Sequence, residues 1–288
     1  MIDTPSLDWK TVLFVPANKP KYLASAINLK PDAVQLDLED SVTADNKEHA
    51  RSLVKAACAE LAKNGIDSIV RVNANAGDLS EDLRASVFEH VNAITLPKLE
   101  SIAELEFVDQ QMSKLEEQRG LAVGGIKLLG LIETLKGLRN RESWIDAPPR
   151  LVGLALGSED LCQQIGCKPT AANLLEPCRK VLYAAREASL TAWGMPISIG
   201  EFTDIKGLEH AMQSAKDMGM AGVWCIHPKQ VEIAKGVFTH SDLEIAQAQK
   251  IVETFEAAVA AGDGAVTVDG AMVDLPVYQR ALDLLKQN

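Results

Sequence analysis

The sequence predicts a (β/α)8 barrel (TIM barrel) followed by a C-terminal helical extension, and three observations support this fold class. The chain has 288 residues, and a barrel of this type needs roughly 250. Eight short, β-branched apolar runs alternate with longer segments of helical periodicity, which is typical of a parallel sheet with helical crossovers. No G-x-G-x-x-G follows the first run, so the usual dinucleotide-binding signal is absent. Eight units fit a closed barrel better than an open doubly wound sheet, which stays the alternative.

The eight apolar runs share one pattern. Each is short and nearly continuous in apolar residues, and polar residues appear only toward its C-terminal end, as expected for strands buried on both faces. In chain order, the expected strands are residues 11–17, 33–40, 68–74, 93–98, 127–134, 151–157, 195–200 and 222–228.

Helical periodicity and capping signals fill the segments between these strands. Asp45 is expected to cap the first clear helix, and Ser101 with Glu104 three residues later forms a capping-box pattern. The expected helices are residues 45–64, 101–119, 172–192, 204–219, 241–261 and 276–287. Residues 1–240 would form the catalytic barrel and residues 241–288 an extension, which could serve as simple packing, a lid or a subunit contact.

Composition excludes several classes of function. The formal net charge of −11 argues against a nucleic-acid partner. No apolar run reaches 18 residues, and no basic stretch followed by an apolar run opens the chain, so neither a membrane span nor a secretory signal is expected. The five cysteines lack the spacing of a zinc site or a disulfide framework. A cytoplasmic location is the resulting expectation.

Polar side chains gather where the expected strands end, which is where barrel enzymes build their active sites. Buried charged groups need a partner, water or a ligand, so these residues are candidates for function. They are Asp37, Glu39, Asp40, Arg71, Asn73, Lys98, Glu133, Glu159, Asp160, Glu201, Asp204 and His227. The alternative is that some of them only cap helices, and for Glu201 and Asp204 the two interpretations are equally balanced.

Glu133 and Asp160 follow adjacent strands and suit a hard divalent cation. Glu133 ends a very apolar strand, so its carboxylate needs a strong partner. Two carboxylates with no nearby His or Cys favour Mg2+, with Mn2+ as the second choice. Arg71 offers a planar fork for a carboxylate or a developing oxyanion.

Three further side chains have open interpretations. Lys98 could bridge carboxylates structurally or contact substrate. His227 could be an acid or base, or could make a structural hydrogen bond to the carboxylates of residues 37–40. Lys19 follows the first strand and could meet a phosphate or lie in a solvated loop.

The order of the motifs resembles a known family. LFVPANKP, AVQLDLEDSV, RVN, LPKLES, LIET, LGSEDL, CIHPKQ and VDGAMVDLPV follow one another along nearly the whole chain. This series is similar to citrate lyase β-subunit-like proteins of the HpcH/HpaI aldolase superfamily, which include malyl-CoA and citramalyl-CoA lyases. The resemblance implies Mg2+ at Glu133 and Asp160 and Arg71 at the keto or hydroxy acid. It also implies that Asp37, Glu39 and Asp40 hold metal waters and orient the site.

The resemblance also implies an activity and an assembly. The activity is cleavage of a 3-hydroxyacyl-CoA, such as citramalyl-CoA or malyl-CoA, to acetyl-CoA plus pyruvate or glyoxylate. The catalytic residues would be Arg71, Asp274, Asp37 and Glu39, and Lys19, Arg71, Asn73, Lys98 and His227 would contact the substrate or CoA. Asp274 would be an acid/base from a lid that often reaches a neighbouring subunit of a homotrimer or hexamer.

Departures from the family pattern leave alternatives open. Ala17-Asn18-Lys19-Pro20 replaces the usual G-D-R-P, Val223 and Trp224 stand where a lysine is common, and SIGEFTD lacks the usual tyrosine. The alternatives are a citrate lyase β subunit acting on an acyl-carrier-bound citryl thioester, a malyl-CoA thioesterase, and a non-catalytic acyl-CoA-binding paralogue.

Overall fold

Eight parallel strands form the centre of the fold. The computed structural model describes residues 7–286, and the strands neighbour one another in the order β7-β6-β5-β4-β3-β2-β1-β8. A parallel bridge between Trp193 and Gly222, with Ala221 N donating to Ala192 O at 2.8 Å, joins the two ends of the sheet. The expected (β/α)8 barrel is therefore confirmed. Its strands are β1 (Thr11–Pro16), β2 (Ala33–Asp37), β3 (Asp67–Arg71), β4 (Ala93–Leu96), β5 (Lys127–Ile132), β6 (Leu151–Leu156), β7 (Thr191–Trp193) and β8 (Val223–Cys225).

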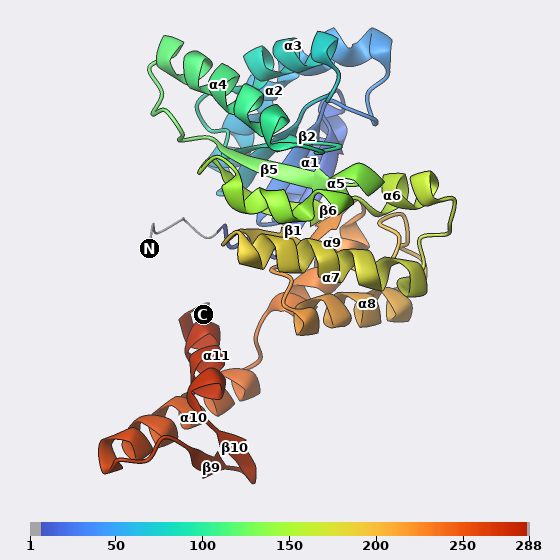
Figure 1. The fold of residues 1–288 in the computed structure, drawn as a ribbon. Coiled ribbons are helices and arrows are strands. Elements are labelled where there is room, and N and C mark those ends of the chain that lie inside the picture. The colour runs from blue at the N-terminus through green and yellow to red at the C-terminus, as the bar shows by residue number, and fades with distance from the viewer. Residues whose placement is uncertain (1–6, 287–288) are drawn as a thin grey trace. The chain divides into compact units, whose positions relative to one another are not determined.

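Helices follow the strands and cover the sheet (Figure 1). They are α1 (Pro20–Leu29), the 3-10 turn η1 (Ala44–Asn46), α2 (Lys47–Lys63), α3 (Ala76–Ser86), α4 (Ile102–Gln118), α5 (Leu135–Arg139), the 3-10 helix η2 (Arg141–Asp146), α6 (Ser158–Ile165), α7 (Ala171–Glu187), α8 (Ile205–Met218) and α9 (Pro228–Phe238). The capping box of Ser101 and Glu104 starts α4 as expected. The N-cap of α2 is Asn46, so the expected cap at Asp45 is wrong by one residue.

Alternate residues of each strand feed two apolar layers. One layer contains Val12, Ile69, Leu129 and Trp193, and the other packs strands against helices through residues such as Leu36. This alternation is the expected consequence of the two-residue period of a strand. It also leaves the C-terminal strand ends free to carry polar side chains.

The seventh strand lies earlier in the chain than the apolar pattern predicts. Residues 195–200 form a loop, and β7 begins within the preceding helix that the periodicity predicted over residues 172–192. The helix α7 ends at Glu187 because Ser189 adopts a left-handed φ of 58° and Leu190 N donates to Ala185 O. The short strand then stops at Gly194, whose φ is 149°. A sequence pattern alone does not reveal the left-handed residue that shortened the helix.

The chain divides into two compact units, one up to Phe238 and one from Thr239 onward. The second unit contains α10 (Asp242–Ala261), the antiparallel pair β9 (Val266–Val268) and β10 (Ala271–Val273), and α11 (Leu275–Lys286). Phe255, Val268 and Val273 form its core, and Tyr278 stacks on Phe255 at 4.8 Å between ring centroids. The expected role of this unit as a lid stays a prediction.

Two expectations concern parts of the chain outside the described residues. The first is the expected lack of a secretory signal, which concerns residues 1–6 among others. The second is the last expected helix, whose final residue, 287, lies outside the described residues. Within residues 7–286, every helix is too short or too polar to cross a membrane.

Candidate active site

A cavity of about 860 Å3 opens at the C-terminal ends of the strands. Its wall combines apolar side chains from β1, β5, β8 and α1 with a group of charged ones. The charged residues are Asp37, Asp40, Arg71, Glu133, Glu159 and Asp160. A largely apolar cavity with a few convergent polar groups is the usual form of a small-molecule site.

Arg71 and Asp37 form a buried, two-pronged ion pair at the ends of β3 and β2. Arg71 Nε donates to Asp37 Oδ1 at 2.7 Å, and Nη2 donates to Oδ2 at 2.9 Å. Ser41 adds Oγ and backbone N–H donors to Oδ2. Burial raises the pKa of Asp37, but the hydrogen bonds and charge of Arg71 outweigh it and hold that pKa below its ordinary value. Asp37 therefore stays ionised and fixes the plane of the guanidinium.

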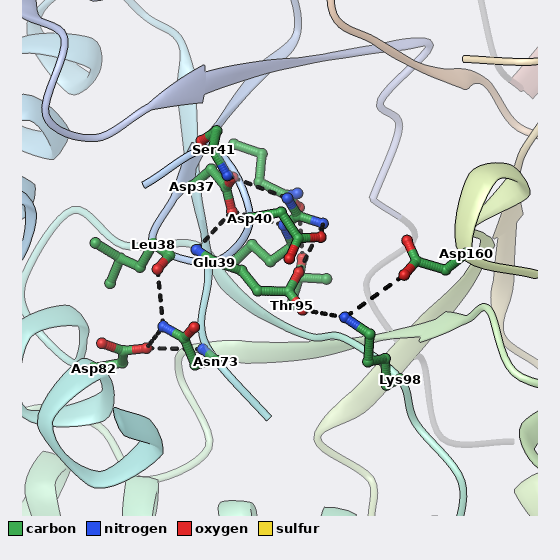
Figure 2. A network of polar contacts seen from close by, with 12 residues as sticks. Asp37, Leu38, Glu39, Asp40, Ser41, Asn73, Asp82, Thr95, Lys98 and Asp160 are labelled. Carbon is green, nitrogen blue, oxygen red and sulfur yellow. Dashed lines mark hydrogen bonds and ion pairs between the residues drawn. The ribbon is translucent and has the colours of Figure 1, made fainter. Parts of the chain in front are cut away.

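Glu39 and Lys98 extend this pair toward Asp160, as Figure 2 shows. Glu39 Oε2 lies 2.9 Å from Arg71 Nη1, and Glu39 Oε1 accepts from Lys98 Nζ at 2.7 Å. Lys98 Nζ lies 3.8 Å from Asp160 Oδ1. The pKa of Glu39 is raised because burial outweighs the two cations. Lys98 thus bridges carboxylates, which is the structural interpretation that the sequence left open.

Glu133 is a buried carboxylate beside other carboxylates. Its side chain is 2% exposed, and Oε1 accepts from the backbone N of Lys98 at 2.8 Å. The pKa of Glu133 is raised to about 8, chiefly by burial and then by the charges of Asp160 and Glu39, which together outweigh the hydrogen bond from Lys98 N and the charge of Arg71. Gly157 makes room for this side chain, because a Cβ there would lie 2.2 Å from Glu133 Oε2. The sequence did not single out Gly157, which the LGSEDL motif contains.

The Glu133 and Asp160 pair fits a hard divalent cation. Within residues 7–286, no group of three or more His, Cys, Asp or Glu side chains gathers as a metal cluster. Two oxygen ligands with room for water match Mg2+, which keeps several waters. A cation would also reverse the raised pKa of Glu133, whose cause is burial among like charges.

Three predicted contact residues do not line the cavity: Asn73, Lys19 and the Lys98 described above. The Asn73 amide donates to Leu38 O at 2.8 Å and to Asp82 Oδ2 at 2.6 Å (Figure 2). Its Oδ1 accepts from Lys47 Nζ at 2.7 Å. Asn73 is therefore occupied in supporting the β2 loop. Lys19 is exposed and immediately precedes α1.

His227 and Asp274 occupy different parts of the protein. His227 lines the cavity, stacks on Phe202 at 4.5 Å between ring centroids, and accepts from Lys229 N through Nδ1 at 3.2 Å. Among residues 7–286, the structure gives no hydrogen bond between His227 and the carboxylates of residues 37–40, which was one interpretation of this residue. Asp274 lies in the C-terminal unit, where Oδ1 accepts from Val277 N at 3.3 Å.

Two acidic residues after β7 follow the capping interpretation. Asp204 caps α8 through a hydrogen bond from Gly207 N at 3.0 Å. Glu201 accepts from Thr203 and from Asp204 N, and these hydrogen bonds lower its pKa to about 2.

Aromatic residues that the sequence did not single out as site residues line the floor. Phe14 and Trp224 contact each other edge to face at 5.4 Å, and the Arg71 guanidinium lies 5.0 Å from the Phe14 ring centroid. The signal was available in the alternation of β1, since Phe14 shares a face with the inward-pointing Val12.

Comparisons with known proteins agree with this site. The family described as HpcH/HpaI aldolase/citrate lyase matches residues 10–228. The chain is 30% identical to citrate lyase subunit beta of Haemophilus influenzae, covering 96% of both chains. It is 34% identical to a (3S)-malyl-CoA thioesterase of Cereibacter sphaeroides, covering 92% of this chain and 90% of the relative. A crystal structure of CitE from Mycobacterium tuberculosis in complex with magnesium, acetoacetate and coenzyme A is similar, with 26% identity, a TM-score of 0.75 and 97% coverage of both chains. The chain therefore belongs to the HpcH/HpaI aldolase/citrate lyase family.

Proposed function

We propose that this protein is a Mg2+-dependent carbon–carbon lyase that cleaves a 3-hydroxyacyl-CoA. The substrate would be citramalyl-CoA or malyl-CoA, and the products acetyl-CoA plus pyruvate or glyoxylate. The observation that carries the proposal is the Glu133 and Asp160 pair, whose raised Glu133 pKa calls for a cation, beside the rigidly held Arg71. Support also comes from the similar CitE structure, which is a complex with magnesium and coenzyme A.

Glu133 and Asp160 would hold the Mg2+ ion, and Arg71 would contact the acid part of the substrate. The bound ion supplies a Lewis acid that lowers the pKa of the substrate hydroxyl and stabilises the new carbonyl. Arg71 stabilises the same oxygen, because Asp37 and Glu39 fix its guanidinium in advance. This preorganisation needs no movement of the arginine during cleavage.

The remaining roles concern the leaving acetyl-CoA. The substrate hydroxyl would lose its proton to water as its oxygen becomes the carbonyl, and the electrons of the broken carbon–carbon bond would go to the acetyl-CoA enolate. Asp274, in its protonated form, would then give a proton to the enolate carbon. In the condensation direction Asp274 removes the same proton. Lys98 keeps Glu39 charged beside Arg71, and His227 and Lys19 contact the CoA part. The protein would form a homotrimer or hexamer, and sedimentation velocity would measure this assembly. Asp274 would act in the active site of its own subunit or of a neighbouring one. The cytoplasmic location stays a prediction.

The test is product analysis across a panel of CoA esters. We expect acetyl-CoA and a 2-oxo acid in the presence of Mg2+, and loss of turnover with EDTA or in Glu133→Ala. Turnover that survives both chelation and this substitution would contradict the metal proposal. The exposed Glu81→Ala serves as a matched control, because Glu81 only pairs with Arg84 on the surface of α3.

A thioesterase is the second candidate, favoured by the 34% identity to a (3S)-malyl-CoA thioesterase. Free CoA and malate as the products, without acetyl-CoA, would identify it. A citrate lyase β subunit, favoured by the relative in Haemophilus influenzae, would act on an acyl-carrier thioester and not on free CoA esters. Binding of CoA esters without turnover would identify a non-catalytic paralogue.

A further inference from the structure

Gln230, in the first turn of α9, is a buried amide that joins two loops. Its side chain is 0% exposed. Oε1 accepts from Ile226 N at 2.7 Å and from His227 N at 3.0 Å, just after β8. Nε2 donates to Ile199 O and Glu201 O, both at 2.8 Å, in the loop after β7. A side-chain amide has two donor hydrogens and two acceptor lone pairs, so every one of them is used.

These contacts lie where the barrel is least supported by its own backbone. Seven neighbouring strand pairs form ladders, but β7 and β8 are joined only by the isolated bridge between Trp193 and Gly222 and the hydrogen bonds beside it. Both strands are three residues long. The segments that continue them toward the cavity therefore lack a shared ladder, and Gln230 supplies the connection there.

The joined segments form one side of the cavity. Ile199, Ile226 and His227 all line it. The His227 ring stacks on Phe202 with an interplanar angle of 6°, so the two loops also meet through their rings.

The same loop is tied to the metal-binding side of the cavity. Ser198 Oγ donates to Glu159 Oε1 at 2.6 Å, and Ile199 N donates to Ser158 Oγ at 3.3 Å. Both acceptors belong to the first turn of α6, which carries Asp160. The position of the β7 loop is thus fixed from α9 on one side and from α6 on the other.

We infer that Gln230 is a positioning residue that sets the cavity wall of Ile199, Ile226 and His227 by joining the loops after β7 and β8. The consequence for substrate binding rests on the proposed function. Without the amide, four backbone groups lose their partner and the wall shifts relative to the metal-binding pair. Since the wall contacts substrate without performing the chemistry, binding should suffer more than turnover.

Gln230→Met tests the inference, with Gln213→Met as the matched control. Gln213 lies exposed on α8 and its amide bonds only to Asp217 of the same helix. The first readout is the proton NMR signal of the His227 ring, assigned with His227→Asn. Stacking on Phe202 shifts this signal upfield, and we expect that shift to be lost in Gln230→Met and kept in Gln213→Met.

The second readout is steady-state kinetics on the thioester that wild type cleaves. We expect KM to rise about ten-fold in Gln230→Met while kcat changes by less than about three-fold. If Gln230→Met does not fold, Gln230→Glu replaces it, because the carboxylate keeps the two contacts after β8 and loses both donors to the β7 loop. An unchanged His227 signal, or a fall in kcat and melting temperature with no change in KM, would overturn the inference. Absence of turnover in wild type would instead refute the proposed function, and the NMR readout, which needs no substrate, would still decide the role of Gln230.

Discussion

A methyl group added at Gly157 should damage the proposed metal site although neither proposed ligand residue is substituted. The Cβ of an alanine there would lie 2.2 Å from Oε2 and 2.5 Å from Cβ of Glu133, whereas ordinary van der Waals contact begins at 3.4 Å. The backbone of Gly157 has φ −90° and ψ 98°, which alanine adopts without strain. The whole effect of Gly157→Ala therefore comes from the collision with Glu133.

Glu133 has little freedom to yield. It is 2% exposed, and moving it breaks the hydrogen bond from Lys98 N or turns the carboxylate away from Asp160. Overpacking of this kind costs about 1–3 kcal/mol of stability. Displacing a ligand by a neighbouring substitution lowers metal affinity by about 10–100-fold, and we expect the Mg2+ activation constant of Gly157→Ala to rise by that factor.

The assay is turnover as a function of Mg2+ concentration, together with urea unfolding in EDTA. Gly236→Ala is the control, since Gly236 lies in α9 with no atom within 4 Å of its added Cβ. A glycine-to-alanine change inside a helix should stabilise the protein by about 0.5–1 kcal/mol and leave the Mg2+ dependence unchanged. A wild-type activation constant in Gly157→Ala would refute the assignment of Glu133 as a ligand.

Three further predictions concern charge. In the metal-free protein Glu133 keeps its proton to about pH 8, whereas in the unfolded chain it ionises near its ordinary pKa of 4.5. The free energy of unfolding should therefore fall as pH rises from 5 to 8. Urea titrations at several pH values should show that Glu133→Gln makes this dependence on pH weaker. Arg71→Lys loses the two-pronged pairing and should lower kcat/KM about 100-fold or more at saturating Mg2+, whereas Arg84→Lys on the surface should not. Asp274→Asn should lower kcat about 100-fold with an unchanged melting temperature. The control Asp283→Asn, at an exposed position of α11, should leave kcat and the melting temperature unchanged. Equal activity of the two variants would exclude an acid/base role for Asp274.

The strand-end rule predicted much of the site because it depends on topology alone. Parallel strands of a barrel present their carboxyl ends at one rim, so Arg71, Glu133 and Asp160 meet although they are distant in sequence. The same rule placed Asn73 in the site, but its amide is taken by Asp82 of α3 and Lys47 of α2. Neither partner is visible in a strand pattern, and α3 was not expected at all.

The sequence did not correctly predict helices and strands whose ends depend on a single backbone angle or which are short. Ser189 in the left-handed region ended α7 early and moved β7 forward by four residues from the expected start at residue 195. The ten-residue helix α1, which begins with Pro20 and buries only Ala26 completely, was not expected. Side-chain bridges such as Gln230, which connects the loops after the adjacent strands β7 and β8, leave no periodic signal.

Opposite pKa shifts in neighbouring carboxylates separate two roles that the sequence combined. Asp37 is held ionised because Arg71 satisfies both of its oxygens, so it gains little from a further cation. The pKa of Glu133 is raised because burial and the charges of Asp160 and Glu39 oppose its ionisation. A divalent ion would be attracted most strongly where negative charge is least compensated, which is between Glu133 and Asp160. Asp37 is therefore better understood as the residue that fixes Arg71 than as a direct holder of the metal. Glu39, whose pKa is raised like that of Glu133, also contacts Arg71 through its Oε2 atom, 2.9 Å from Nη1.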